Sequence, residues 1–89
     1  MERIWVAELS ISPRVSNKIN GEHNVSDGEV RDAVVCVAGL YGRWDEHPTR
    51  GLRALLDTTI RDRPVTVVVY PRDHPMGDAW ALGSVYFVN

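Results

Sequence analysis

The sequence is poor in cysteine and in long apolar runs. Cys36 is its one cysteine, so a single chain can form neither a disulfide framework nor a cysteine-based zinc site. This usage fits a reducing compartment, and we expect a cytoplasmic protein. No stretch approaches the roughly 20 apolar residues that a membrane span needs, and no basic and apolar leader opens the chain. We therefore expect neither membrane insertion nor secretion.

Positive charge is also scarce. Ten lysines and arginines face twelve aspartates and glutamates, which gives a net charge of −2 and a pI near 5.8. This balance disfavours a protein that holds RNA mainly through phosphate contacts. Nine of the ten cations are arginines, the residue best suited to bidentate contacts with phosphate or carboxylate. Arginines and acids alternate in the second half, however, so mutual neutralisation is the simpler interpretation.

What remains is an ordinary globular composition, 44% hydrophobic and 25% charged over 89 residues. A chain of this length supports one compact core and leaves no room for a second. The sequence therefore predicts a single domain over residues 1–89 that folds on its own.

The chain opens with an expected strand and a short helix. Apolar and polar residues alternate over residues 3–11, which is typical of a half-buried strand. Ser12 and Pro13 are suited to the N-cap and first position of a helix, and Asn20 with Gly21 predicts where this helix ends.

A second helix is predicted from a capping box. Ser26 can accept from the backbone amide of Glu29 while Glu29 reaches back to Ser26, and Val25 can pack on Val30 across the cap. Apolar residues at helical spacing carry the helix to about Val37.

After Gly39 the spacing becomes alternating and predicts an antiparallel meander. The expected fold is α+β, with an N-terminal strand and two short helices packed on one face of a four- to five-stranded, mainly antiparallel sheet. The strands of the meander are expected at residues 40–44, 52–60, 65–70 and 79–88. Residues 49–56 also fit a helical face capped by Thr49, but the β-branched residues that follow favour a strand.

Several short motifs follow one another along the chain. They are His23-Asn24-Val25, Ser26 with Glu29, Arg50 ahead of residues 52–59, Arg63, and Val67-Val68-Val69-Tyr70. In this order they resemble the BrnT-like branch of the RelE toxin superfamily, whose members carry His-Gly-Val, a helix with Glu near its start, an Arg-containing strand and a Val-Val-Tyr strand.

The resemblance implies a toxin that cleaves messenger RNA without a metal ion or other cofactor and is neutralised by a tightly bound antitoxin. On that resemblance Arg50 and Arg53 hold the phosphate, while Tyr70, His74 or His23 pass protons or orient the nucleophile. The three histidines of the chain show no paired spacing with other ligands, so we expect no metal site.

Two departures favour binding over catalysis. Ser84 in the last strand has a family counterpart, but the arginine and the basic terminal helix that follow it in the family have none. The net charge is also acidic. In the plainer interpretation Arg50 and Arg53 pair with acids on neighbouring strands, and His23 is a loop residue.

The leading hypothesis is therefore a small intracellular toxin-like protein that binds and inhibits a protein partner, either a host target or an antitoxin. Such proteins are common in phages and mobile elements. Two helices cover one face of the sheet, so aromatic residues remain for contact on the other. We assign this role to Trp44, Trp80 and Tyr86 and expect a homodimer through the C-terminal strand if it forms a free edge. The alternative is the metal-independent endoribonuclease.

Overall fold

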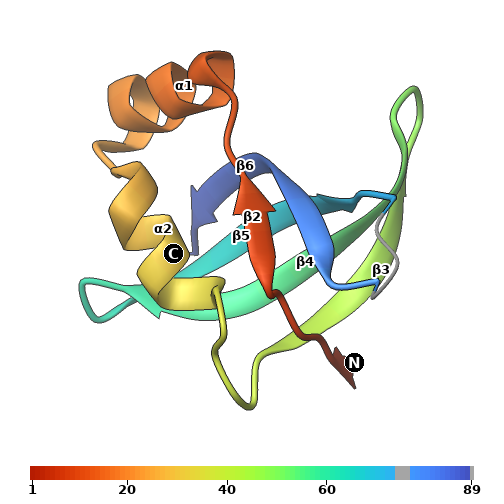
Figure 1. The fold of residues 1–89 in the computed structure, drawn as a ribbon. Coiled ribbons are helices and arrows are strands. Elements are labelled where there is room, and N and C mark those ends of the chain that lie inside the picture. Colours follow the sequence, from red (N-terminus) through yellow and green to blue (C-terminus); the bar gives the residue numbers. More distant parts are fainter. Residues whose placement is uncertain (74–76, 89) are drawn as a thin grey trace.

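The computed structural model describes residues 1–73 and 77–88. Over these residues two helices accompany a curled, mixed sheet (Figure 1), so the predicted α+β class is confirmed. The elements in chain order are β1 (Glu2–Arg3), β2 (Glu8–Ser10), α1 (Pro13–His23), α2 (Asp27–Val34), β3 (Tyr41–His47), β4 (Gly51–Ile60), β5 (Arg63–Pro71) and β6 (Ala79–Phe87).

The sheet has six strands in the order β1-β3-β4-β5-β6-β2. Strands β3 to β6 form the predicted antiparallel meander. The prediction of four to five strands was too low, and β2 pairs with β6 in parallel, placing Glu8–Ser10 beside Ala79–Ala81. Strands β1 and β2 lie on opposite edges although only residues 4–7 separate them. The five Cα–Cα steps from Arg3 to Glu8 span about 18 Å at most, so the sheet has to curl until its edges approach each other.

The predicted first strand, residues 3–11, is split in two by this curl. At the break the Ile4 amide donates to the Leu40 carbonyl at 2.9 Å, and the Val6 carbonyl accepts from the Cys36 amide at 2.8 Å. Both apolar side chains are buried. Periodicity showed the extended backbone correctly but could not show that the chain changes its pairing partner at this point.

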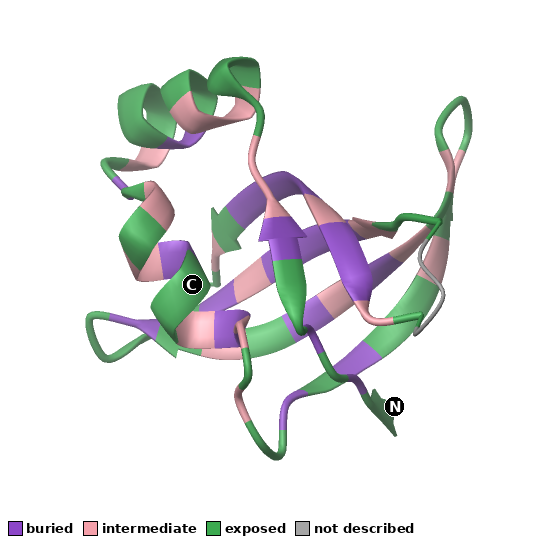
Figure 2. Ribbon diagram, viewed as in Figure 1, coloured by how far each residue is buried: buried purple, intermediate pink, exposed green. Residues whose placement is uncertain are grey.

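The hydrophobic core lies on the inner face of the curled sheet, and both helices contribute buried residues to it, which are purple in Figure 2. Alternate residues of the meander point inward because successive strand side chains lie on opposite faces. The fully buried members come from every part of the chain: Val6, Ile19, Val25, Val30, Val34, Ala54, Leu56, Val67, Val69 and Val85. Each large aliphatic side chain buried in this way contributes about 1.5–3 kcal/mol.

Helix α1 begins as predicted and ends later. The Ser12 hydroxyl accepts from the Val15 amide at 3.2 Å, and Pro13 occupies the first turn. The helix passes Gly21 because Asn24 closes it instead: Asn24 is left-handed at φ 54° and donates its amide to the Asn20 carbonyl. Helix α1 packs against β6 (Figure 1).

Helix α2 has the predicted capping box and a shorter body than expected. It ends at Val34 rather than near Val37, because Val35 turns extended and forms an isolated bridge with Val6. Cys36 then adopts a positive φ of 56°. The pairing with Val6 therefore outweighs the helical spacing of the valines.

Residues 49–56 follow the strand alternative. Strand β4 starts at Gly51, whose φ of 83° ends the preceding turn. The His47 ring nitrogen Nδ1 accepts from the backbone amides of Thr49 and Arg50, so this histidine orders the turn.

The last strand is only in part the edge strand on which the homodimer prediction depends. Strand β2 pairs with residues 79–81 of β6, and α1 packs against β6 as well. Among the described residues the rest of β6 pairs with β5 alone, so a homodimer through this strand stays a prediction.

Candidate functional site

Arg53 and Tyr70 lie together on the outer face of the sheet, opposite the core. Their neighbours Ala54 and Val69 point into the core, and alternation places the two polar side chains on the other side. Arg53 Nε donates to Asp45 Oδ2 on β3 at 2.6 Å. The pKa of the Arg53 guanidinium is raised, first by this bond with Asp45 and second by the Tyr70 hydroxyl.

Arg50 completes this cluster from the β3–β4 turn. Its guanidinium carbon lies 4.0 Å from the centroid of the Tyr70 ring, a cation–π contact. The ring also lies against Gly83, where an added Cβ would come within 2.5 Å of Tyr70 Cε2. Gly83 sits at a register shift opposite Val68 and Val69. The register shift in β6 and the lack of a side chain at Gly83 therefore make room for the Tyr70 ring, and this ring holds Arg50.

A groove of about 470 Å³ lies beside this cluster, lined by Ser12, Arg14, Val15, Lys18, Arg50 and Gly83. We call it the basic groove. In Figure 1 the first turn of α1 and the β3–β4 turn stand on either side of the curved part of β6. Two walls from distant parts of the sequence therefore bring three cations to one cavity.

The three cations of the basic groove keep their charge uncompensated. Over residues 1–73 and 77–88, Arg14, Lys18 and Arg50 make no ion pair, whereas Arg53 is paired with Asp45 and Arg61 with Glu29. A chain with a net charge of −2 thus carries a local excess of positive charge. Such a cavity attracts anions.

The sequence predicts only part of this site. Arg50, Arg53 and Tyr70 are predicted site residues that the fold brings together, whereas Arg14 and Lys18 were not predicted. A usable signal existed, because two basic residues four positions apart share one face of a helix. The sequence did not indicate that this helix face lies across the groove from Arg50.

The proposed histidines do not join the cluster within the described residues. His23 lies at the far end of α1 from Arg14, about 13 Å along the helix axis. Its ring lies 6.2 Å from the rings of both Tyr86 and Phe87. His74 lies outside the described residues.

The three aromatic residues assigned to partner binding do not form one surface. Trp44 is 43% exposed at the end of the inner face, and Trp80 lies buried beside it with the ring centroids 5.7 Å apart. Tyr86 is exposed on the outer face. Leu52 on β4 is a diagonal neighbour of Trp44, and both side chains are exposed.

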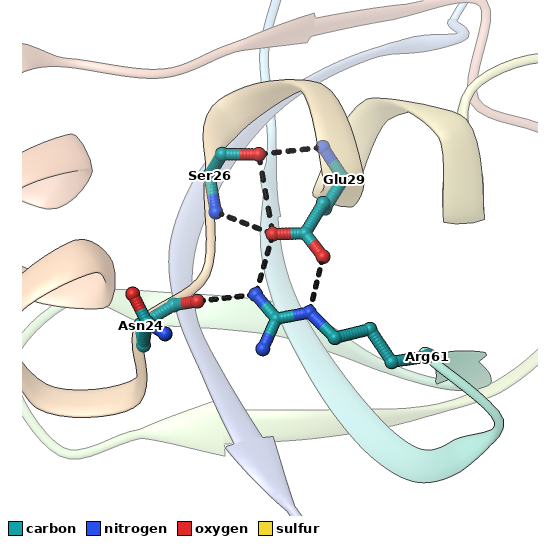
Figure 3. Close-up of polar contacts among 4 residues, drawn as sticks. All are labelled: Asn24, Ser26, Glu29 and Arg61. Carbon is teal, nitrogen blue, oxygen red and sulfur yellow. Dashed lines mark hydrogen bonds and ion pairs between the residues drawn. The ribbon is translucent and has the colours of Figure 1, made fainter.

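A second polar cluster joins α2 to the β4–β5 turn (Figure 3). Arg61 Nε donates to Glu29 Oε2 at 2.6 Å and a terminal nitrogen donates to Oε1 at 2.7 Å, while the same guanidinium reaches the Asn24 carbonyl. Glu29 also accepts from the Ser26 amide at 3.1 Å. The Arg61 guanidinium, followed by that amide, lowers the pKa of Glu29 to about 2.

This second cluster is structural. Its carboxylate and guanidinium satisfy each other, and they hold the two-residue turn at Arg61 and Asp62, where both residues have positive φ. That geometry matches a type I′ hairpin turn, which usually requires Asn or Gly. The ion pair compensates for the missing turn residues.

The described part of the chain holds no group of three or more His, Cys, Asp or Glu side chains placed to bind a metal ion. Within the same part, no helix is long and apolar enough to cross a membrane.

Comparison of the chain with known protein families, with curated proteins and with solved structures found no match. The case for a function therefore depends on the geometry of the basic groove and of the Arg50–Tyr70–Arg53 cluster.

Proposed function

We propose that the protein is a toxin-like endoribonuclease that cleaves RNA at the Arg50–Tyr70–Arg53 cluster and needs no metal ion. The observation that carries this proposal is the convergence of these three side chains, two arginines around one tyrosine, beside a cation-lined groove. The resemblance to the BrnT-like branch of the RelE superfamily is part of the same proposal.

The reaction needs a base, an acid and positive charge. The ribose 2′-oxygen forms a bond to the adjacent phosphorus and gives up its proton, while the bond from phosphorus to the 5′-oxygen breaks and that oxygen gains a proton. The products are a 2′,3′-cyclic phosphate and a 5′-hydroxyl. Negative charge grows on the phosphoryl oxygens during the step, and nearby guanidinium groups stabilise it.

The cluster offers the positive charge and the acid in fixed positions. Arg50 is held on the Tyr70 ring and carries no competing ion pair with a described residue, so its charge is free for a phosphoryl oxygen. The Tyr70 hydroxyl lies beside Arg53 and donates its proton to the departing 5′-oxygen, while a solvent water accepts the proton of the 2′-hydroxyl. The overall acidic balance is no obstacle, because the groove gathers its own positive charge.

The proposal is tested by incubating the purified protein with a labelled single-stranded RNA in the presence of EDTA. We expect cleavage to persist and to fall roughly 10²–10³-fold in Arg50→Ala, which loses a charge-stabilising group. Tyr70→Phe keeps the ring under Arg50 and loses only the hydroxyl, so a fall of at least about 10²-fold identifies proton transfer.

The matched control is Arg63→Ala, which removes an arginine that also stacks on an aromatic ring, Phe87, at 4.3 Å. Strand β5 carries Arg63 at the end remote from Tyr70. We expect its rate to equal that of the parent. Intact RNA after incubation with the folded parent protein would reject the nuclease.

The second candidate is a non-catalytic protein that binds a host target or an antitoxin. It is favoured by the exposure of Trp44 and Leu52 side by side on β3 and β4. In this case expression of the parent arrests bacterial growth while RNA stays intact, and Trp44→Ala with Leu52→Ala relieves the arrest. If Arg50→Ala relieves the arrest and the Trp44/Leu52 variant does not, this candidate fails.

A further inference from the structure

We infer that the α1 wall of the basic groove is a subsite for the backbone of single-stranded RNA, in which Arg14 and Lys18 bind a phosphate neighbouring the one held by Arg50. This inference rests on the proposed function and extends it to residues that no motif marked.

The α1 wall is rigidly placed. Ile19 is fully buried and Val15 packs against the core, so this face of α1 is fixed on the protein. Arg14 and Lys18 each precede one of these two residues and therefore flank the buried stripe together. Both line the groove with Val15.

The groove suits phosphate groups in size and chemistry. Its volume of about 470 Å³ lies within the range of small-ligand pockets, roughly 300–1,000 Å³. Such pockets are usually lined mainly by apolar side chains, whereas three of the six lining residues here are Arg or Lys. Gly83 contributes no side chain to fill the cavity.

Two cation-bearing walls favour a chain of phosphates over a single anion. Arg14 and Lys18 come from α1 and Arg50 from the β3–β4 turn. Successive phosphates of one strand present a negative charge to each wall, and each contact releases counterions from the nucleic acid. Binding then depends steeply on salt.

The test measures binding without cleavage. A short single-stranded RNA carrying 2′-O-methyl groups lacks the attacking hydroxyl, and fluorescence anisotropy gives its Kd over a series of NaCl concentrations. For Arg14→Ala/Lys18→Ala we expect the slope of log K against log salt to become shallower by about 0.7, the value for one lost phosphate contact on a single strand. At low salt we expect affinity to fall roughly tenfold.

Three kinds of control accompany this binding measurement. Arg63→Ala should leave affinity and slope unchanged, and Arg14→Lys/Lys18→Arg, which keeps both charges, should stay close to the parent. Circular dichroism confirms that α1 is intact in each variant. Inorganic phosphate and a mononucleotide serve as competitors, and we expect neither to displace the RNA at concentrations where unlabelled RNA does.

The outcomes separate the inference from the proposed function. If the double variant binds with the parental Kd and slope while Arg50→Ala binds weakly, the subsite is wrong and the nuclease can stand. Displacement by mononucleotide at RNA-like concentrations also overturns the subsite, because the ligand is then a small phosphate compound. If the double variant loses binding but the parent cleaves no RNA, the subsite stands and the nuclease fails.

Discussion

Gly83 is the residue on which the geometry of the Arg50–Tyr70–Arg53 cluster depends most directly. We expect Gly83→Ala to destabilise the fold by about 1–3 kcal/mol, because its methyl would lie 2.5 Å from Tyr70 Cε2 and 3.1 Å from Cδ2. A displaced Tyr70 ring also releases Arg50. The urea midpoint at constant m-value measures the first effect, and RNA binding measures the second.

Gly21 gives the matched control for this substitution. It lies inside α1, and an added Cβ would meet nothing within 4 Å. Gly21→Ala should therefore stabilise the protein by up to about 1 kcal/mol, through the lower entropy of the unfolded chain. Equal losses in both variants would contradict the role assigned to Gly83.

At the scale of elements, the α2 cap predicts a response to acid. The pKa of Glu29 is about 2 in the folded protein and about 4.5 when it is unfolded, so the unfolded state binds more protons between these values. The stabilisation from Glu29 is fully present above pH 4.5 and is lost as pH falls through about 2. We expect the urea midpoints of the parent and Glu29→Gln to converge toward pH 2.

Two variants check the assignment of this response. Arg61→Ala should reproduce the behaviour of Glu29→Gln, because it removes the main cause of the lowered pKa. Glu2→Gln alters an exposed glutamate that makes no ion pair with any residue of the described ranges, and it should follow the parent. A difference in urea midpoint between the parent and Glu29→Gln that stays constant from pH 7 to pH 2 would contradict the assignment.

The same cap shows what sequence can predict. Ser12, Pro13, Ser26 and Glu29 fixed both helix starts, because caps act within a few residues and their chemistry is local. The ends of α1 and α2 were missed, since Asn24 and the pairing of Val35 with Val6 decide them. The basic groove could not be predicted for the same reason, because Arg14 and Arg50 come to line one cavity only after the sheet has curled.

At the scale of the whole molecule, helices and strands share one core, and we expect them to unfold together. Leu56 is fully buried in the central strand β4, so Leu56→Ala should cost about 2–5 kcal/mol. Far-UV circular dichroism and the fluorescence of buried Trp80 should give coincident transitions in parent and variant. Leu52→Ala on the same strand is the control, with a change within about 0.5 kcal/mol because the side chain is exposed. Separate transitions would show that the helices form an independent unit.

The curled sheet also constrains the order of assembly during synthesis. Leu9 pairs with Trp80, so β2 leaves the ribosome well before β6 and waits for it before it finds its neighbour. Until β6 has emerged, Leu9 has no sheet to pack against. The part of the meander that has already formed also has an unpaired edge at β5. Pairing over such a separation is slow to form, and the growing chain is most open to aggregation or to capture by chaperones in this interval.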